Sequence, residues 1–200
     1  ILILSVQPLH SSEINSFSPI VKKVAPSIVS IYTEKKSKSK SSTIADDPIF
    51  NQFFGSQGNS YLEQSLGSGV IIEKEGIIIT NEHVINDSQD IRVTLPDQRE
   101  FSAHLIVSEK KTDIAILKID DQSVDFPYAK MGNSDLLETG DRVIAIGNPF
   151  GIGQTVTSGI ISAVSRNNSN ISDHEFFLQT DAAINPGNSG GALVNMNAEV

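Results

Sequence analysis

The sequence contains no cysteine and no tryptophan, and aromatic residues make up only 6% of its 200 positions. The absence of cysteine excludes a disulfide framework, a thiolate zinc site and a cysteine nucleophile. It leaves the compartment undecided, because a chain without cysteine suits the cytoplasm and the periplasm equally. With so few aromatic side chains, the core has to be built from Ile, Val and Leu, and this β-branched composition favours strands over helices.

Long apolar runs are absent as well. No stretch approaches the roughly 18 residues that a membrane-spanning helix needs, so we expect no integral membrane span. The first six residues are nearly all apolar and fit either the end of a secretory signal or a simple N-terminal arm. A secretory signal also has a basic segment and a small-residue cleavage site, and neither is present here. Because the sequence has no initiating Met, we expect it to begin inside a longer product.

Positive charge is scarce. The chain has 15 Lys and Arg against 24 Asp and Glu, which gives a net charge of -9 and a pI near 4.8. An acidic chain repels phosphate backbones, so nucleic acid is not an expected partner. Ordinary solubility is the simplest explanation of this charge.

Short apolar segments separated by turn residues fill most of the chain after residue 27. Strands do not alternate with helices, so the pattern predicts an all-β sandwich or barrel rather than a doubly wound sheet. A short helix is expected before the first strand, with Ser18 as its N-cap, Pro19 as its first residue and Pro26 as its end. Residues 74–76 predict a hairpin turn, and residues 120–137 a join between two halves. The predicted strands are 28–33, 68–73, 77–80, 91–95, 100–108 and 114–119 in the first half, and 142–147, 155–164, 176–180 and 191–195 in the second.

A polar segment, residues 34–66, interrupts the first half. It carries four lysines between residues 35 and 40, which fit either a solvated loop or a binding patch. It also carries Phe50, Phe53 and Phe54. Three phenylalanines in a polar loop require burial, either against this domain or against another subunit.

The sharpest local motif is GNSGG at residues 187–191. A serine hydroxyl is a weak nucleophile that needs a neighbouring base, and its reaction needs backbone N–H groups aimed at the developing oxyanion. Glycines permit the tight turn that directs such amides into one cavity. The motif also fits a plain turn between strands. The hydrolase elbow is excluded, because its acid and histidine follow the serine, and no histidine follows Ser189.

A base therefore has to lie upstream of Ser189. Of the four histidines, His83 directly follows the apolar strand at 77–79, and a strand end is a rigid mount for a side chain that enters a cleft. Asp113 is the best candidate for the orienting acid, because it precedes the apolar run 114–117 and is expected to be buried and paired there. A structural histidine and a turn-capping aspartate are the alternatives. The order His, Asp, Ser is that of the chymotrypsin-type template.

Several collinear blocks resemble those of the HtrA/Deg serine proteases, from about residue 24 to the end. The blocks are LGSGVII (66–72), TNEHV (80–84), DIAILK (113–118), AIGNPFG (145–151), QTVTSGI (154–160), QTDAAIN (179–185) and GNSGG (187–191). The resemblance implies two perpendicular six-stranded antiparallel β-barrels of the trypsin type, with the site between them. It implies a serine endopeptidase that degrades unfolded or misfolded proteins in the bacterial periplasm, without metal or cofactor. It also implies a homotrimer or larger oligomer of trimers, in which the phenylalanine loop reaches a neighbouring subunit.

The resemblance assigns a role to each site residue. His83 is the general base and then the general acid, Asp113 orients its imidazole, and Ser189 attacks the scissile carbonyl. The backbone N–H groups of Gly187 and Ser189, with Asn188 between them, form the oxyanion hole.

The resemblance also divides the chain. Residues 1–26 are expected to form an N-terminal arm and short helix, 27–125 a first barrel with the long loop 34–66, and 126–200 a second barrel. The sequence contains no PDZ domain, and only eleven residues follow Ser189, so we expect the second barrel to be incomplete. A fragment and a naturally short protein both fit this. The alternative function is an inactive domain that binds unfolded chains as a chaperone does.

Overall fold

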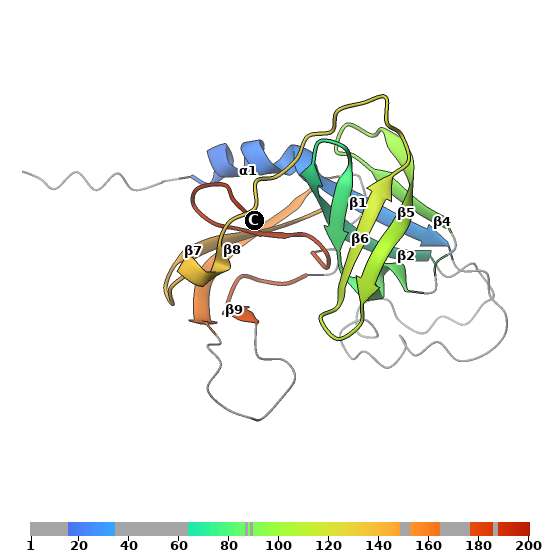
Figure 1. Cartoon of the computed structure of the whole chain (residues 1–200). Helices are drawn as coiled ribbons and strands as arrows, with labels where there is room; N and C mark the ends of the chain where they lie inside the picture. The colour runs from blue at the N-terminus through green and yellow to red at the C-terminus, as the bar shows by residue number, and fades with distance from the viewer. Residues whose placement is uncertain are drawn as a thin grey trace, which may run out of the picture.

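The first half of the chain forms a closed antiparallel β-barrel (Figure 1). The computed structural model describes residues 16–34, 64–86, 88, 90–148, 153–164, 177–185 and 188–200. Strands follow one another around the barrel in the order β1-β2-β3-β6-β5-β4, and β1 pairs with β4 to close it. The strands are β1 (Ile28–Glu34), β2 (Gln64–Glu73), β3 (Ile77–Thr80), β4 (Asp90–Thr94), β5 (Glu100–Glu109) and β6 (Ile114–Ile119).

Alternating burial along the strands fills this barrel with aliphatic side chains. In β6, for example, Ala115, Leu117 and Ile119 are fully buried while the residues between them are more exposed. This is the period of two that one-sided burial of a strand requires. Phe126 closes the core against Phe101, with the two rings edge to face and 5.1 Å apart.

The second half is a four-stranded antiparallel sheet in the order β10-β7-β8-β9. Its strands are β7 (Arg142–Gly147), β8 (Thr155–Val164), β9 (Leu178–Thr180) and β10 (Ala192–Val194). A single 3-10 turn, η3 (Ser134–Leu136), lies in the segment that joins the two halves. The all-β expectation, with a second barrel that is not complete, is confirmed.

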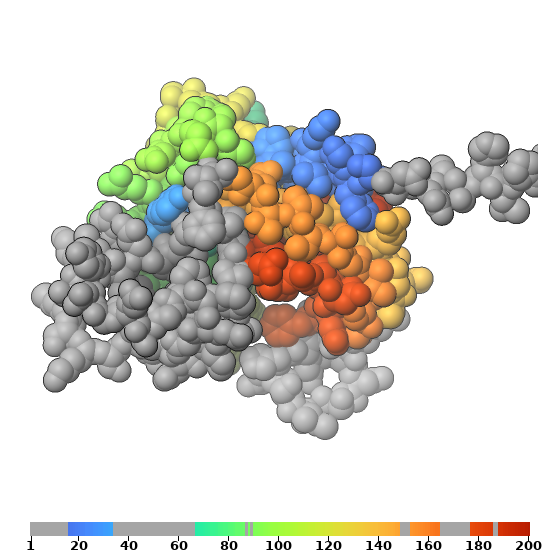
Figure 2. All heavy atoms as spheres, turned by 180° about the vertical axis from the view of Figure 1, so that it is seen from behind, coloured from blue at the N-terminus to red at the C-terminus, as the bar shows by residue number. Residues whose placement is uncertain are grey.

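A second apolar core holds the two halves together. Ile28 of β1 and Val70 of β2 lie opposite each other in register, and both pack with Ile144 and Ile146 of β7 rather than inside the barrel. Helix α1 (Ser18–Val24) adds Ile20 and Val24 to this core, and the 3-10 turn η1 (Ala25–Ser27) leads from it into β1. Figure 2 shows the blue residues of α1 beside the orange residues of the second sheet.

The predicted helix is present, but its start differs. Phe17 is the N-cap and has no side-chain cap, so Ser18 lies inside the helix and does not cap it. The Phe17 ring instead packs under the Arg142 guanidinium, 4.8 Å from its centroid. Glu34 and residues 64–66 belong to β1 and β2 rather than to the long loop. The rest of that loop, with Phe50, Phe53 and Phe54, lies outside the described residues. In the part of the chain that the structure describes, no helix is long and apolar enough to cross a membrane.

Candidate active site

The pairing of β3 with β6 brings His83 and Asp113 together. Thr80 at the end of β3 lies opposite Ala115 at the start of β6. The residues just beyond these two strand ends are therefore neighbours. His83 lies in the one-turn helix α3 (Glu82–Ile85), and its Nδ1 is 2.7 Å from Oδ2 of Asp113. A carboxylate only accepts hydrogen bonds, so Nδ1 carries the proton, and Nε2 of the neutral ring is left as the basic nitrogen.

Asp113 is held by four hydrogen bonds to residues 81–83. Its Oδ1 accepts from the backbone N–H of His83 at 2.9 Å, in addition to the bond between Oδ2 and the ring. Its carbonyl oxygen accepts from Glu82 N at 3.1 Å and from Asn81 Nδ2 at 2.8 Å. The expectation of a buried carboxylate is wrong, because the Asp113 side chain is 41% exposed. Hydrogen bonds from His83, rather than burial, fix the carboxylate in place.

Ser189 lies in a loop that is hydrogen-bonded to the first barrel through the peptide group between Ser189 and Gly190. Ser68 N donates to the Ser189 carbonyl oxygen at 2.9 Å, and Gly190 N donates to Asn81 Oδ1 at 2.6 Å. Since Asn81 also bonds to Asp113, the three predicted triad positions lie around one side chain. Among the described residues, however, no hydrogen bond joins the Ser189 hydroxyl to His83. The structure thus pairs the histidine with the aspartate and anchors the serine loop nearby.

The predicted oxyanion-hole amides are only partly described. Asn188 N already donates to the Asn185 carbonyl at 3.0 Å, so this N–H group is not available to a substrate. The Asn188 side chain is buried. Gly187 lies outside the described residues. Ser189 N and Gly187 N therefore stay the candidates for this role.

A second histidine–aspartate pair lies away from the candidate site. His104 Nδ1 is 2.5 Å from Asp120 Oδ1, and both side chains are exposed. His104 in β5 pairs with Lys118, toward the opposite end of β6 from Asp113. The remaining histidines, His10 and His174, lie outside the described residues.

Sequence reasoning missed the polar residues that join the two halves of the site. Thr80 Oγ1 donates to the Ser68 carbonyl at 2.7 Å, and Asn148 N donates to Ser68 Oγ at 2.8 Å. Asn81 stands beside them at the end of β3. The available signal was an Asn immediately before a one-turn helix, the N-cap position, but no pattern in the sequence tells what its side chain bonds to.

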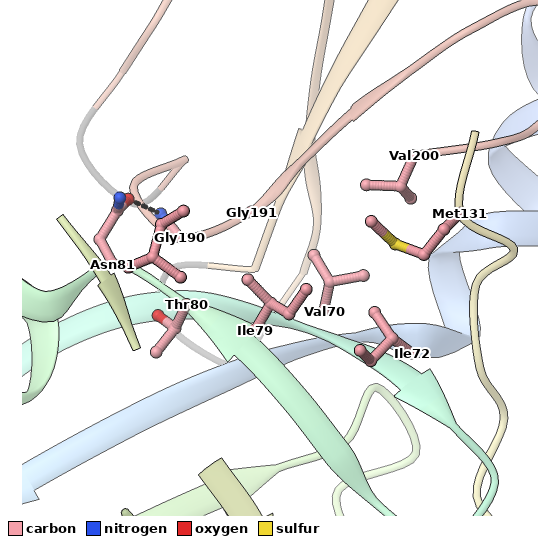
Figure 3. Close-up of a pocket in the computed structure, with 10 residues that line it drawn as sticks. Val70, Ile72, Ile79, Thr80, Asn81, Met131, Gly190, Gly191 and Val200 are labelled. Atoms are coloured by element: carbon pink, nitrogen blue, oxygen red, sulfur yellow. Dashed lines mark hydrogen bonds between the residues drawn. The ribbon is translucent and has the colours of Figure 1, made fainter. Parts of the chain in front are cut away.

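A small apolar cavity of about 150 Å³ lies next to Asn81 and Gly190 (Figure 3). Its other walls come from both halves of the molecule and are mainly aliphatic: Val70, Ile72, Ile79, Thr80, Ile114, Met131, Gly191 and Val200. Among the residues that the structure describes, no group of three or more His, Asp or Glu side chains is arranged to hold a metal ion.

Comparison with known proteins shows the family to which the chain belongs. The model of the trypsin-like peptidase domain family matches residues 67–200. The chain is 44% identical over 207 residues to a probable periplasmic serine protease do/HhoA-like of Haemophilus influenzae, covering 96% of this chain and 44% of that protein. It is also 44% identical over 198 residues to the periplasmic pH-dependent serine endoprotease DegQ of Escherichia coli, covering 97% of this chain and 43% of DegQ.

Solved structures agree as well. The HtrA-type protease AlgW with a decapeptide superposes with a TM-score of 0.74 at 45% sequence identity, covering 92% of this chain and 56% of that chain. The chain spans less than half the length of the curated relatives it matches. The range matched by the family model, residues 67–200, spans the positions of His83, Asp113 and Ser189. The chain therefore belongs to the trypsin-like peptidase family, as a member of its HtrA/Deg serine proteases.

Proposed function

We propose that this chain is the protease domain of a serine endopeptidase that cleaves unfolded or misfolded proteins, with His83, Asp113 and Ser189 as its catalytic triad. The observation that carries the proposal is the bond from His83 Nδ1 to Asp113 Oδ2, beside a serine loop anchored to the same strand end. The spacing of 2.7 Å is that of a charge-assisted hydrogen bond. It is the geometry by which an aspartate holds a histidine in the basic tautomer.

The chemistry is acyl transfer in two steps. Ser189 Oγ attacks the scissile carbonyl carbon while its proton passes to His83 Nε2, and the carbonyl oxygen becomes an oxyanion. The N–H groups of Gly187 and Ser189 donate to this oxyanion. His83 then returns the proton to the departing amine, which breaks the peptide bond and leaves an acyl-enzyme. A water molecule then gives a proton to His83 Nε2 and attacks the acyl carbon. The ester bond to Ser189 Oγ breaks, the acid product leaves, and His83 returns the proton to Ser189 Oγ.

Location and assembly complete the proposal. The periplasm is the compartment named for the H. influenzae and E. coli relatives. We assign the active site to the junction of a first barrel, residues 27–125, and a second, residues 126–200. A homotrimer, or an oligomer of trimers, is expected from the resemblance to HtrA proteins. Light scattering coupled to gel filtration tests this point, and a monomer at micromolar concentration would contradict it.

Cleavage of an unfolded protein tests the activity. Reduced and carboxymethylated lactalbumin is incubated with the protein, with Ser189→Ala and with Ser123→Ala. Ser123 is an exposed serine whose side chain bonds to Asp121 in the segment after β6. We expect the wild type and Ser123→Ala to cleave at equal rates, and Ser189→Ala to lose about 10⁶-fold in kcat. Cleavage that persists in Ser189→Ala would contradict the serine mechanism. Binding of the unfolded protein without any cleavage by the wild type would favour the chaperone-like alternative.

A further inference from the structure

The side chain of Asn81 connects the two halves of the candidate site. Its Nδ2 donates to the carbonyl oxygen of Asp113 at 2.8 Å. Its Oδ1 accepts from Gly190 N at 2.6 Å, the bond drawn as a dashed line in Figure 3. A carbonyl only accepts and a backbone N–H only donates, so these partners allow one orientation of the amide. The planar side-chain amide of Asn81 thus holds Asp113 and Gly190, the residue after Ser189, at a fixed separation.

Asn81 does not make the side-chain capping bond that is usual for an asparagine at its position. It is the N-cap of α3, where the side-chain oxygen ordinarily accepts an N–H from the first turn of the helix. Here its side chain makes no such bond. Asp113 takes over, because its carbonyl accepts from Glu82 N and its Oδ1 accepts from His83 N. Asp113 thus accepts the backbone N–H groups of Glu82 and His83. The side chain of Asn81 is left to bond with the serine loop at Gly190.

The Gly190 end of the bridge is closely fitted. Gly190 has a φ of +77°, in the left-handed region that favours glycine. A Cβ at this position would clash with the Ser68 carbonyl oxygen and with Thr80 Oγ1. Residues of β2 and β3 therefore enclose Gly190, while Asn81 sets the direction of its N–H. Because Gly190 directly follows Ser189, its peptide orientation also sets the orientation of the serine backbone.

We propose that Asn81 is a positioning residue for the acyl-transfer reaction, which couples the orientation of Asp113 to that of the Ser189 loop. This inference rests on the proposed function. Asn81 acts through the Asp113 carbonyl and the Gly190 amide, and it needs no contact with the substrate. Its loss leaves binding of the substrate nearly unchanged and misaligns the nucleophile relative to its base.

Two substitutions separate the two ends of the bridge. Asn81→Ala removes both bonds, and kcat should fall about 10- to 100-fold while KM changes less than about twofold. Asn81→Asp keeps an acceptor for Gly190 N but loses the donor to Asp113, so it should recover part of kcat. Its added negative charge beside the His83–Asp113 pair should also move the acid limb of kcat/KM to higher pH, because it favours the protonated imidazole.

The assay uses peptide hydrolysis by the full-length protein, with kcat normalised to the sites titrated by a fluorophosphonate. This normalisation removes the effect of unfolded molecules. Asn133→Ala is the control, because the Asn133 side chain accepts the N–H of Asp135, two residues further on in the linking segment, and this bond joins no distant parts of the chain. It should retain wild-type kcat and pH dependence. Wild-type kcat in Asn81→Ala, or an unmoved acid limb in Asn81→Asp, would overturn the proposal.

The wild-type protein gives a test that needs no variant to fold. If the bridge exists, the Gly190 amide proton exchanges with solvent at least about 100-fold more slowly than a free loop amide. Exchange at the free rate would overturn it. Failure of the proposed function is a separate result, because it would appear as hydrolysis that survives in Ser189→Ala. A Ser189→Ala protein without activity, together with a fully active Asn81→Ala protein, would overturn only the role of Asn81.

Discussion

Asp113 combines two functions in one strained position. With φ at 54° it lies in the left-handed region, where an aspartate has a higher conformational energy than in the extended or helical regions. This conformation lets its carbonyl and its carboxylate face the same short segment, residues 81–83. The sequence placed Asp113 correctly before the buried strand β6, but the left-handed backbone depends on long-range bonds that no local pattern encodes.

We predict that Asp113→Asn lowers kcat by about 10⁴-fold, because an amide allows the wrong imidazole tautomer. The control is Asp120→Asn, which alters a pair of the same residue types, 2.5 Å apart, that lies away from the site. Hydrolysis rates of the two variants, measured on folded protein, give the comparison. Equal activity of Asp113→Asn and Asp120→Asn would mean that Asp113 is not the orienting acid.

Substitutions at Gly190 and Gly140 distinguish the effect of a strained backbone from the effect of a steric clash. Both have positive φ, +77° and +101°, but a Cβ at Gly140 would meet nothing within 4 Å. We expect Gly140→Ala to lower the free energy of unfolding by about 1–2 kcal/mol through φ alone. Gly190→Ala adds the clash with Ser68 and Thr80, for a total of about 3–5 kcal/mol. Urea unfolding measures both, and equal losses would contradict the tight fit around Gly190.

At the scale of elements, helix α1 stabilises the second sheet. Ile20 is 8% exposed and packs in the core shared with β7, and Gln154 Nε2 donates to the carbonyl of Ala25 just after the helix. We predict that Ile20→Ala lowers the free energy of unfolding by about 2 kcal/mol. Lys22→Ala, on the exposed side of the helix, should change it by less than about 0.5 kcal/mol. A loss in Lys22→Ala as large as that in Ile20→Ala would show that α1 is not docked.

The segment that links the two halves is tied to the last residues of the chain. Lys130 Nζ is 2.5 Å from Glu199 Oε1, and Asn195 Nδ2 donates to the other carboxylate oxygen at 3.1 Å. The hydrogen bond from Lys130, and then that from Asn195, lowers the pKa of Glu199 below its ordinary value of 4.5. Val200 N and the Lys130 carbonyl join the same segments through the backbone at 2.9 Å.

This lowered pKa predicts a pH-dependent contribution to stability. The unfolded state binds more protons at Glu199 in the window between the lowered value and 4.5, so stability rises with pH there. Glu199→Gln should therefore be less stable than the wild type at pH 7. The difference should shrink below pH 4.5 and vanish below the folded pKa.

Urea unfolding at a series of pH values measures this difference. Lys130→Gln should lose the same contribution, and the double variant should lose no more than either single variant. A difference that is unchanged from pH 7 to acid would contradict the bond between Lys130 and Glu199.

Short apolar or β-branched runs separated by turn residues made most elements predictable. The bounds of β3, β6, β7 and β8 agree with the predicted segments, because each of these strands is such a run. The helix start differs because Phe17 packs under Arg142, a tertiary contact that local capping rules do not include. Strand β2 begins earlier than predicted, at Gln64, because residues 64–67 continue the antiparallel pairing with β1.

At the scale of the whole molecule, the active site depends on how the two halves join. The order of His83, Asp113 and Ser189 along the chain predicted which residues to compare. It could not predict the hydrogen bonds from Gly190 to Asn81 and from Ser68 to Ser189, because each of them joins residues more than a hundred positions apart. The shared core with Ile28 and Val70 was equally hidden, since their strands belong to the barrel and their side chains pack outside it.

The most direct test of the account is labelling of the folded protein with a fluorophosphonate, located by mass spectrometry. Fluorophosphonates react with a serine only where a base and an oxyanion hole activate it. We expect a single labelled residue, Ser189, with labelling lost in Ser189→Ala and strongly slowed in Asp113→Asn. Labelling at another residue, or none at all in protein shown to be folded, would contradict the claim that these residues form a working triad.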